Sequence, residues 1–197
     1  MKESRRRVYD NGIYTERWAK GALGRQKSLN STATLVQAVL PFVPYSFVDI
    51  GAGIGTCVRL LRAAGKIGYG IDGIANVEAI SGALVHWADL SEPLPLCFDP
   101  AYTAISIEVG EHIPPDCAQV FLDNLTGMAR KTLVLSWAPV HRAGTGHVNC
   151  QDAPWVHDQL DLRGFYVDVS ATRDLQRTAG RGWGGKLWVA RRASGRC

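Results

Sequence analysis

Two groups of residues in this 197-residue chain could do chemistry together. In the first, Glu108, Glu111 and His112 stand at positions i, i+3 and i+4, which would put them on one face of a helical turn. His147, in a Gly-Thr-Gly-His-Val-Asn segment, follows a later predicted strand. Two carboxylates and two imidazoles suit a divalent ion such as Mg²⁺ or Mn²⁺. Such an ion, or a base, would favour negative charge developing on an acceptor hydroxyl.

The other histidines and the tryptophans were weighed against this cluster. His141 is the alternative fourth ligand, but the adjacent Arg142 indicates a solvated loop, and the small residues around His147 allow closer approach. We expect structural or surface roles for His86 and His157. Trp137 and Trp183 are core candidates, or walls of an acceptor pocket.

The second group is a glycine-rich turn at residues 48–56, Val-Asp-Ile-Gly-Ala-Gly-Ile-Gly-Thr, between a predicted strand and a predicted helix. Gly51, Gly53 and Gly55 would allow a tight turn and close approach of a ligand to the backbone. The third glycine follows the second by two residues instead of three, which disfavours a dinucleotide. Asp72 ends the next strand, where it can accept both ribose hydroxyls, and Asp89 after the third strand can face an adenine amino group. Together they predict a site for a nucleoside without phosphates.

Hydrophobic periodicity predicts the elements that position these groups. Helical patterns cover residues 31–40, 55–65, 115–128 and 152–164, and strand patterns cover 46–50, 67–71, 83–87, 103–107, 132–137, 165–169 and 187–190. The Gly/Arg-rich residues 173–185 are expected to form a loop. Alternating strands and helices are typical of an α/β fold with a mostly parallel sheet.

From about Phe47 onward, the order strand, D-x-G-x-G-x-G, acidic strand end and Asp-Leu resembles the class I S-adenosylmethionine-dependent methyltransferases. The resemblance implies a single Rossmann-like domain whose seven-stranded sheet is mostly parallel, with the last strand antiparallel. It also implies S-adenosylmethionine as cofactor, held by Asp49, Gly51, Gly53, Gly55, Asp72, Gly73, Asp89 and Leu90.

The first group has a resemblance of its own. Its E-x-x-E-H spacing plus a later His is similar to Hen-type small-RNA 2′-O-methyltransferases and to ubiquinone-biosynthesis O-methyltransferases, where the set is associated with a divalent metal. The stretches EVGEHIP and GTGHVN also resemble small methyltransferases of bacteria and phages. This likeness implies that Glu108, Glu111, His112 and His147 bind a metal or orient the acceptor.

Composition narrows the class of protein. With 46% hydrophobic and 20% charged residues, the chain can bury one sizeable core. No apolar run is long enough for membrane insertion, and five scattered cysteines suggest a reducing compartment, so we expect a cytoplasmic protein.

We expect residues 1–45 to form an N-terminal lid or helix segment, including Tyr9, Tyr14 and Trp18, and residues 46–197 to form the cofactor-binding domain.

Several functions stay open at this point. The first is O-methylation of a small-molecule or glycan hydroxyl. Residues 1–30 carry eight Lys and Arg against three acids, and residues 163–197 carry eight against two, so an anionic acceptor or an RNA end is the alternative. An inactive methyltransferase fold that serves as a scaffold is the third. The glycine spacing counts against a nicotinamide dehydrogenase.

Overall fold

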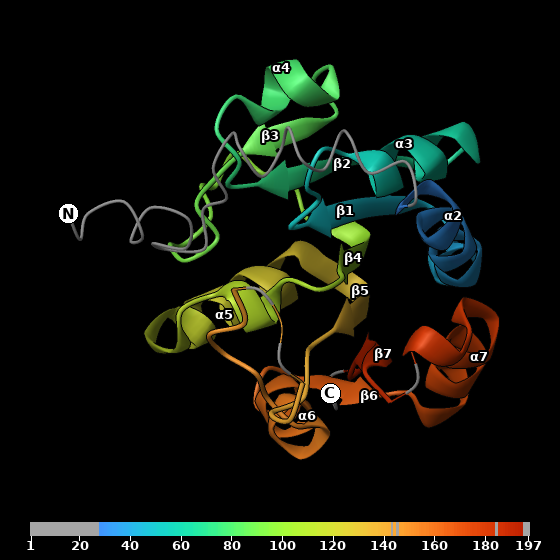
Figure 1. Cartoon of the computed structure of the whole chain (residues 1–197), viewed down its shortest axis with the longest axis vertical. Helices are drawn as coiled ribbons and strands as arrows, with labels where there is room; N and C mark the ends of the chain where they lie inside the picture. The colour runs from blue at the N-terminus through green and yellow to red at the C-terminus, as the bar shows by residue number, and fades with distance from the viewer. Residues whose placement is uncertain (1–27, 143, 145, 184, 195–197) are drawn as a thin grey trace.

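A computed structural model describes residues 28–142, 144, 146–183 and 185–194 of the chain. Its centre is a seven-stranded sheet with the strand order β3-β2-β1-β4-β5-β7-β6 (Figure 1). The strands are β1 (Ser46–Ile50), β2 (Ile67–Asp72), β3 (Val85–Trp87), β4 (Ala101–Ser106), β5 (Ala129–Ser136), β6 (Phe165–Val167) and β7 (Leu187–Arg192).

The sheet confirms the predicted fold class. The first five strands pair in parallel, and β7 runs antiparallel between β5 and β6. The order reverses beside β1, because the chain leaves β3 at one edge of the sheet and returns on the other side of β1 as β4. In α/β sheets, ligands bind outside the carboxyl ends of the strands at such a switch point.

Helices cover both faces of the sheet (Figure 1). On one face lie α2 (Ser28–Val39), α3 (Thr56–Ala63) and α7 (Val169–Ala179), whose apolar residues share one core cluster with the sheet. On the other lie α5 (Ala118–Met128) and α6 (Ala153–Asp161). A short α4 (Val77–Ser81) packs beside β3. The other helical segments among the described residues are single 3₁₀ turns: η3 (Leu40–Phe42), η4 (Gly110–His112), η5 (Pro115–Cys117) and η6 (Arg181–Trp183).

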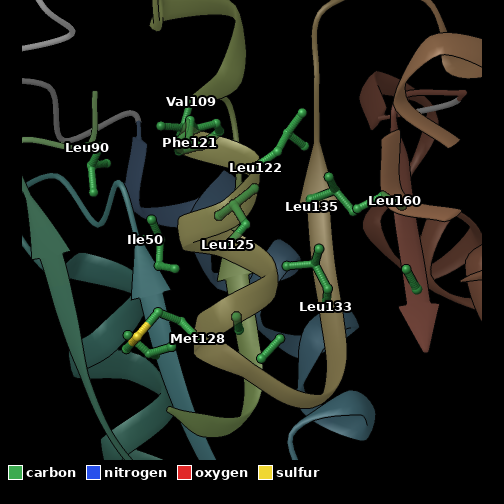
Figure 2. Packing of buried hydrophobic residues seen from close by; sticks show 14 of the residues in the cluster. Ile50, Leu90, Val109, Phe121, Leu122, Leu125, Met128, Leu133, Leu135 and Leu160 are labelled. Carbon is green, nitrogen blue, oxygen red and sulfur yellow. The ribbon is translucent and has the colours of Figure 1, made fainter. Parts of the chain in front are cut away.

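Helix α5 shows how the hydrophobic core holds the strand ends in place. Phe121, Leu125 and Met128 recur at helical spacing, are at most 5% exposed, and face the sheet (Figure 2). They belong to the same buried cluster as Ile50 of β1 and Leu133 of β5. Burying a side chain of this size contributes about 1.5–3 kcal/mol. One shared core therefore holds the ends of β1, β4 and β5 in fixed positions relative to one another.

The prediction that residues 173–185 form a loop is wrong. Most of it belongs to α7, which begins at the N-cap Asp168, whose carboxylate accepts a hydrogen bond from the Ala171 amide at 3.0 Å. Leu175 is fully buried, whereas most of the helix is polar, so the apolar stripe is too narrow to stand out from the sequence. The helix also separates β6 from β7, so these strands are paired without forming a tight hairpin.

Two other expectations concern the N-terminus and membranes. The lid residues Tyr9, Tyr14 and Trp18 lie outside the described residues, whereas α2 packs against α3 and α7 as part of the main body. Within the described part of the chain, no helix combines the length and the apolar character that a membrane span requires.

Candidate active site

The two predicted groups of residues meet at the carboxyl edge of the sheet. The glycine turn follows β1, Glu108 and η4 follow β4, and the segment with His147 follows β5. Since β4 pairs with both β1 and β5, these three connections are neighbours. Sequence reasoning predicted this arrangement, and the structure shows how each part is held.

The glycine turn depends on backbone conformations and on space that glycine provides. Gly51, Gly53 and Gly55 have φ values of 81°, 57° and 81°, in the left-handed region. A Cβ on Gly51 would lie 2.3 Å from Cγ2 of Val109, so the turn packs directly against the segment after β4. The cofactor-type turn and the acidic segment are thus in contact.

Asp72 anchors the glycine turn from β2. Its Oδ2 accepts a hydrogen bond from the Gly53 amide at 2.7 Å, and its Oδ1 accepts one from the Ile74 amide at 3.0 Å. Burial raises the pKa of Asp72 to about 6, against the effect of these amides. Each carboxylate oxygen has a second lone pair, so the group can still accept ligand hydroxyls.

Asp49 lies deeper in the same region, at the end of β1. Its side chain is buried, and burial raises its pKa to about 7. The nearby charge of Asp72 adds to this rise, while a hydrogen bond with the Cys57 thiol opposes it. The carboxyl groups of Asp49 and Asp72 therefore interact electrostatically beside the glycine turn.

The predicted adenine-side residues flank the end of β3. Asp89 Oδ1 accepts hydrogen bonds from the Ser91 amide at 2.9 Å and the Ser91 hydroxyl at 2.6 Å, so it also shapes a turn. Leu90 is buried. Sequence reasoning missed Trp87, which is 50% exposed, pairs in register with Asp72, and donates its indole N–H to the Gly73 carbonyl at 3.3 Å. Its place at a strand end was the available signal.

Three of the four predicted metal-binding residues come together. One ligand atom from each of Glu111, His112 and His147 can be chosen so that all lie within 4.8 Å of one another. The segment after β5 is tied to η4, because the amides of Val148 and Asn149 donate to the Glu111 carbonyl at 2.9 and 3.0 Å. These backbone bonds bring His147 to the acidic turn.

The hydrogen bonds of the two histidines determine which nitrogen can bind a metal. His112 Nδ1 lies 3.0 Å from the Gly146 carbonyl, and His147 Nδ1 lies 3.2 Å from the Arg142 carbonyl. A carbonyl oxygen only accepts, so these contacts favour the tautomer with the proton on Nδ1 and the lone pair on Nε2. Metal-binding histidines commonly donate their second N–H to a backbone carbonyl. Burial lowers the pKa of His112, which favours the neutral ring.

The Glu111 carboxylate is the most unusual group in the site. It is fully buried, and neither oxygen has a hydrogen bond of ordinary geometry among the described residues. Burial raises its pKa to about 7; the charge of Glu108 adds to the rise, while Lys186 and nearby backbone amides oppose it. A buried carboxylate without partners is costly unless a cation compensates it. The donor set therefore fits a divalent ion.

Glu108 departs from the expected helical turn. Its φ is 58°, in the left-handed region, and only residues 110–112 form the 3₁₀ turn η4. Its Oε1 accepts hydrogen bonds from Lys186 Nζ at 2.8 Å and from the Ser136 hydroxyl at 3.1 Å. Glu108 thus lies at the same edge, outside the three-residue cluster.

Lys186 is a site residue that sequence reasoning missed. Its side chain is 6% exposed, and its ammonium lies 4.7 Å from the centre of the Trp183 ring. No local pattern marks it, because the antiparallel placement of β7 brings it beside β5. It also borders an open hollow of about 610 Å³ that is lined by Pro139, His141, Arg142, Asp152, Ala153, Gly185 and Lys186.

The remaining candidates have other positions. His141 lines the hollow and is not part of the three-residue cluster. Trp137 is fully buried and donates its indole N–H to the Asn149 carbonyl at 2.6 Å, so it supports the segment of His147 instead of lining a pocket. His86 and His157 pack on Tyr69 and Trp188, consistent with the expected structural roles.

Comparison with known proteins identifies the fold. No family model and no curated protein matches the sequence. Among solved structures, the chain is similar to magnesium protoporphyrin IX methyltransferase from Synechocystis PCC 6803 with bound SAH, at 20% identity and a TM-score of 0.61, covering 87% of this chain and 84% of that chain.

Two further structures extend the likeness. A chain in the complex of the Haloferax volcanii Trm112 methyltransferase activator with a candidate methyltransferase matches at 17% identity and a TM-score of 0.66, covering 92% of this chain and 97% of that one. The methyltransferase domain of bacterial CtHen1-C matches at 17% identity and a TM-score of 0.60, covering 84% and 100%. The chain therefore has the Rossmann-like methyltransferase fold, as the sequence predicted.

Proposed function

We propose that this protein is an S-adenosylmethionine-dependent methyltransferase that methylates an oxygen of its acceptor. The observation that carries the proposal is the contact between the two parts of the site: Gly51 of the cofactor-type turn packs against Val109, two residues from Glu111. Solved structures of similar fold with bound SAM or SAH support the choice of cofactor.

The chain's own residues can bind and orient this cofactor. Gly51, Gly53 and Gly55 keep the backbone open for the methionine part, and Asp72 can accept the ribose hydroxyls. Asp89, with Leu90 and Gly73 nearby, would face the adenine. When bound, S-adenosylmethionine supplies a methyl group on a positively charged sulfur, already a good leaving group. The protein then contributes mainly by positioning and by excluding water.

Glu111, His112 and His147 would hold Mg²⁺ or Mn²⁺ beside the acceptor. The ion would supply positive charge that favours the ionised form of an acceptor hydroxyl. Without it, the two imidazoles and the carboxylate could still accept a proton or orient the hydroxyl. Glu108 and Lys186 would form the adjoining wall, and the hollow bordered by Lys186 would admit the acceptor.

The acceptor class that we favour is a small-molecule or glycan hydroxyl. An RNA ribose hydroxyl is the second candidate, because residues 1–30 and 163–197 are basic and the exposed Arg142, which borders the hollow, can face an anionic group. RNA binding would weaken steeply with salt, whereas binding of a neutral acceptor would not.

Calorimetry with S-adenosylmethionine and S-adenosylhomocysteine, with and without Mn²⁺ and with NAD as control, tests the proposal. We expect micromolar binding of the first two and none of NAD. His147→Ala should keep cofactor affinity within about twofold while methyl transfer to a responsive acceptor falls at least tenfold, since the residue is expected on the acceptor side. Absence of cofactor binding would leave the chain as a methyltransferase fold used as a scaffold.

A further inference from the structure

Glu108 forms an ion pair with Lys186 and does not belong to the cluster of Glu111, His112 and His147. Lys186 Nζ donates to Glu108 Oε1 at 2.8 Å, and the ammonium is almost excluded from solvent. The Ser136 hydroxyl donates to the same oxygen at 3.1 Å. Ser136 Oγ also accepts the Glu108 amide at 2.7 Å, so both ends of the residue are attached to β5.

The backbone of Glu108 strengthens this arrangement. Its φ of 58° is rare for a residue with a side chain, and it turns the chain directly after β4. Glu111 and His112 lie beyond this turn, in η4. No comparable bond holds Glu111, neither of whose oxygens has a hydrogen bond of ordinary geometry among the described residues. Glu108 therefore has a direct lysine partner, whereas Glu111 forms no ion pair among the described residues.

We propose that Lys186 holds Glu108 out of the metal shell, so that the divalent ion has three protein ligands, Glu111, His112 and His147. This inference rests on the proposed function, since it assumes that the cluster binds a metal. Moving Glu108 to the ion would leave a buried ammonium without its partner, which is strongly unfavourable. Lys186 is thus a positioning residue that acts through Glu108 and leaves open positions on the ion for water or the acceptor oxygen.

Titration of the full-length protein with Mn²⁺, following free Mn²⁺ by electron paramagnetic resonance, tests the ligand set without any acceptor. Glu108→Gln should bind Mn²⁺ within about twofold of the wild type, whereas Glu111→Gln should bind at least tenfold more weakly. Equal weakening by the two substitutions would overturn the inference, because it would make Glu108 a ligand. Failure of the wild type to bind Mn²⁺ would overturn it as well, while S-adenosylmethionine binding in the same preparation would leave the proposed methyltransferase intact.

The role of Lys186 requires a second set of variants. Lys186→Met releases Glu108, so Mn²⁺ affinity should rise severalfold, and the rise should vanish in the double variant Lys186→Met with Glu108→Gln. Lys186→Arg should bind Mn²⁺ with the wild-type affinity, because the positive charge that pairs with Glu108 is kept. Lys131→Met, at an exposed lysine near the opposite end of β5, controls for the loss of one positive charge. Unchanged affinity in Lys186→Met would overturn the positioning role.

Discussion

Asp72 supports the local fold and is also the residue predicted to bind the ribose of the cofactor. Its two oxygens accept the amides of Gly53 and Ile74 at 2.7 and 3.0 Å, so the carboxylate sets the shape of the glycine turn, and in the proposed function it would also accept the ribose hydroxyls. The sequence predicted its position at a strand end. It did not predict the bonds to the turn, because they join segments 19 residues apart and depend on how β1 and β2 pair.

We expect Asp72→Ala to weaken S-adenosylhomocysteine binding by more than about tenfold in calorimetry. The substitution removes the ribose acceptor and leaves two amides without partners, at a cost of about 1–3 kcal/mol each. Asp72→Asn should have a smaller effect, since it keeps one acceptor oxygen. The control is Asp174→Ala, at an exposed pair with Arg177 on α7. An unchanged affinity in folded Asp72→Ala would place the cofactor elsewhere.

At the scale of elements, the sequence was a good guide where apolar periodicity is strong. The strands β1 and β5 and the helix α5 bury several large apolar residues each, so their patterns are clear. Helix α7 has one buried leucine and was missed. The turn η4 was expected to be α-helical and to include Glu108, but Pro114 follows closely and the chain forms only three residues of 3₁₀ helix.

Gly110 provides a test of how η4 is supported. A Cβ at this position would lie 2.5 Å from Cε3 of Trp137, whose side chain is fully buried, so the ring or the backbone would have to shift. We expect Gly110→Ala to destabilise the protein by about 1–3 kcal/mol and to weaken Mn²⁺ binding, since Glu111 and His112 follow directly. Chemical denaturation measures the first effect and Mn²⁺ titration the second.

The matched control for this substitution is Gly127→Ala. Gly127 is exposed within α5, and a Cβ there would meet nothing within 4 Å. Alanine should therefore stabilise that helix by about 0.5–1 kcal/mol. If both alanine variants had the same stability, the contact between Gly110 and Trp137 would not constrain η4.

At the scale of the whole molecule, the sheet brings together charged residues that are far apart in the sequence. Asp49 and Asp72 lie near the carboxyl ends of β1 and β2, Glu111 lies in η4 after β4, and all three are at most 4% exposed. Lys186 joins them from the antiparallel strand end, about 75 residues after Glu111 in the chain. Composition and motif spacing could predict the acids, because they follow local patterns. The lysine partner depends on the β5–β7 pairing and so required the structure.

These buried acids make the stability of the ligand-free protein depend on pH. Burial raises the pKa of Glu111 from 4.5 to about 7, so its neutral form favours the folded state. This contribution is fully present below the ordinary pKa of 4.5 and is lost as the pH rises to about 7. At 1.36 kcal/mol per pKa unit, the loss from this one group is at most about 3 kcal/mol. Asp49 and Asp72 change in the same direction, with pKa values raised to about 7 and about 6.

We therefore expect the free energy of unfolding to fall between pH 5 and pH 8, as measured by urea denaturation. Glu111→Gln should flatten this fall and be about 1–3 kcal/mol more stable than the wild type at pH 8 without metal, because no charge is buried. Mn²⁺ should stabilise the wild type more at pH 8 than at pH 5, since the metal needs the ionised carboxylate, and should have little effect on the variant. Glu92→Gln, at an exposed position, should follow the wild-type curve. A Glu111→Gln variant that was less stable than the wild type at pH 8 without metal would show that the carboxylate is compensated within the protein itself, and would remove the main argument for a cation at this edge.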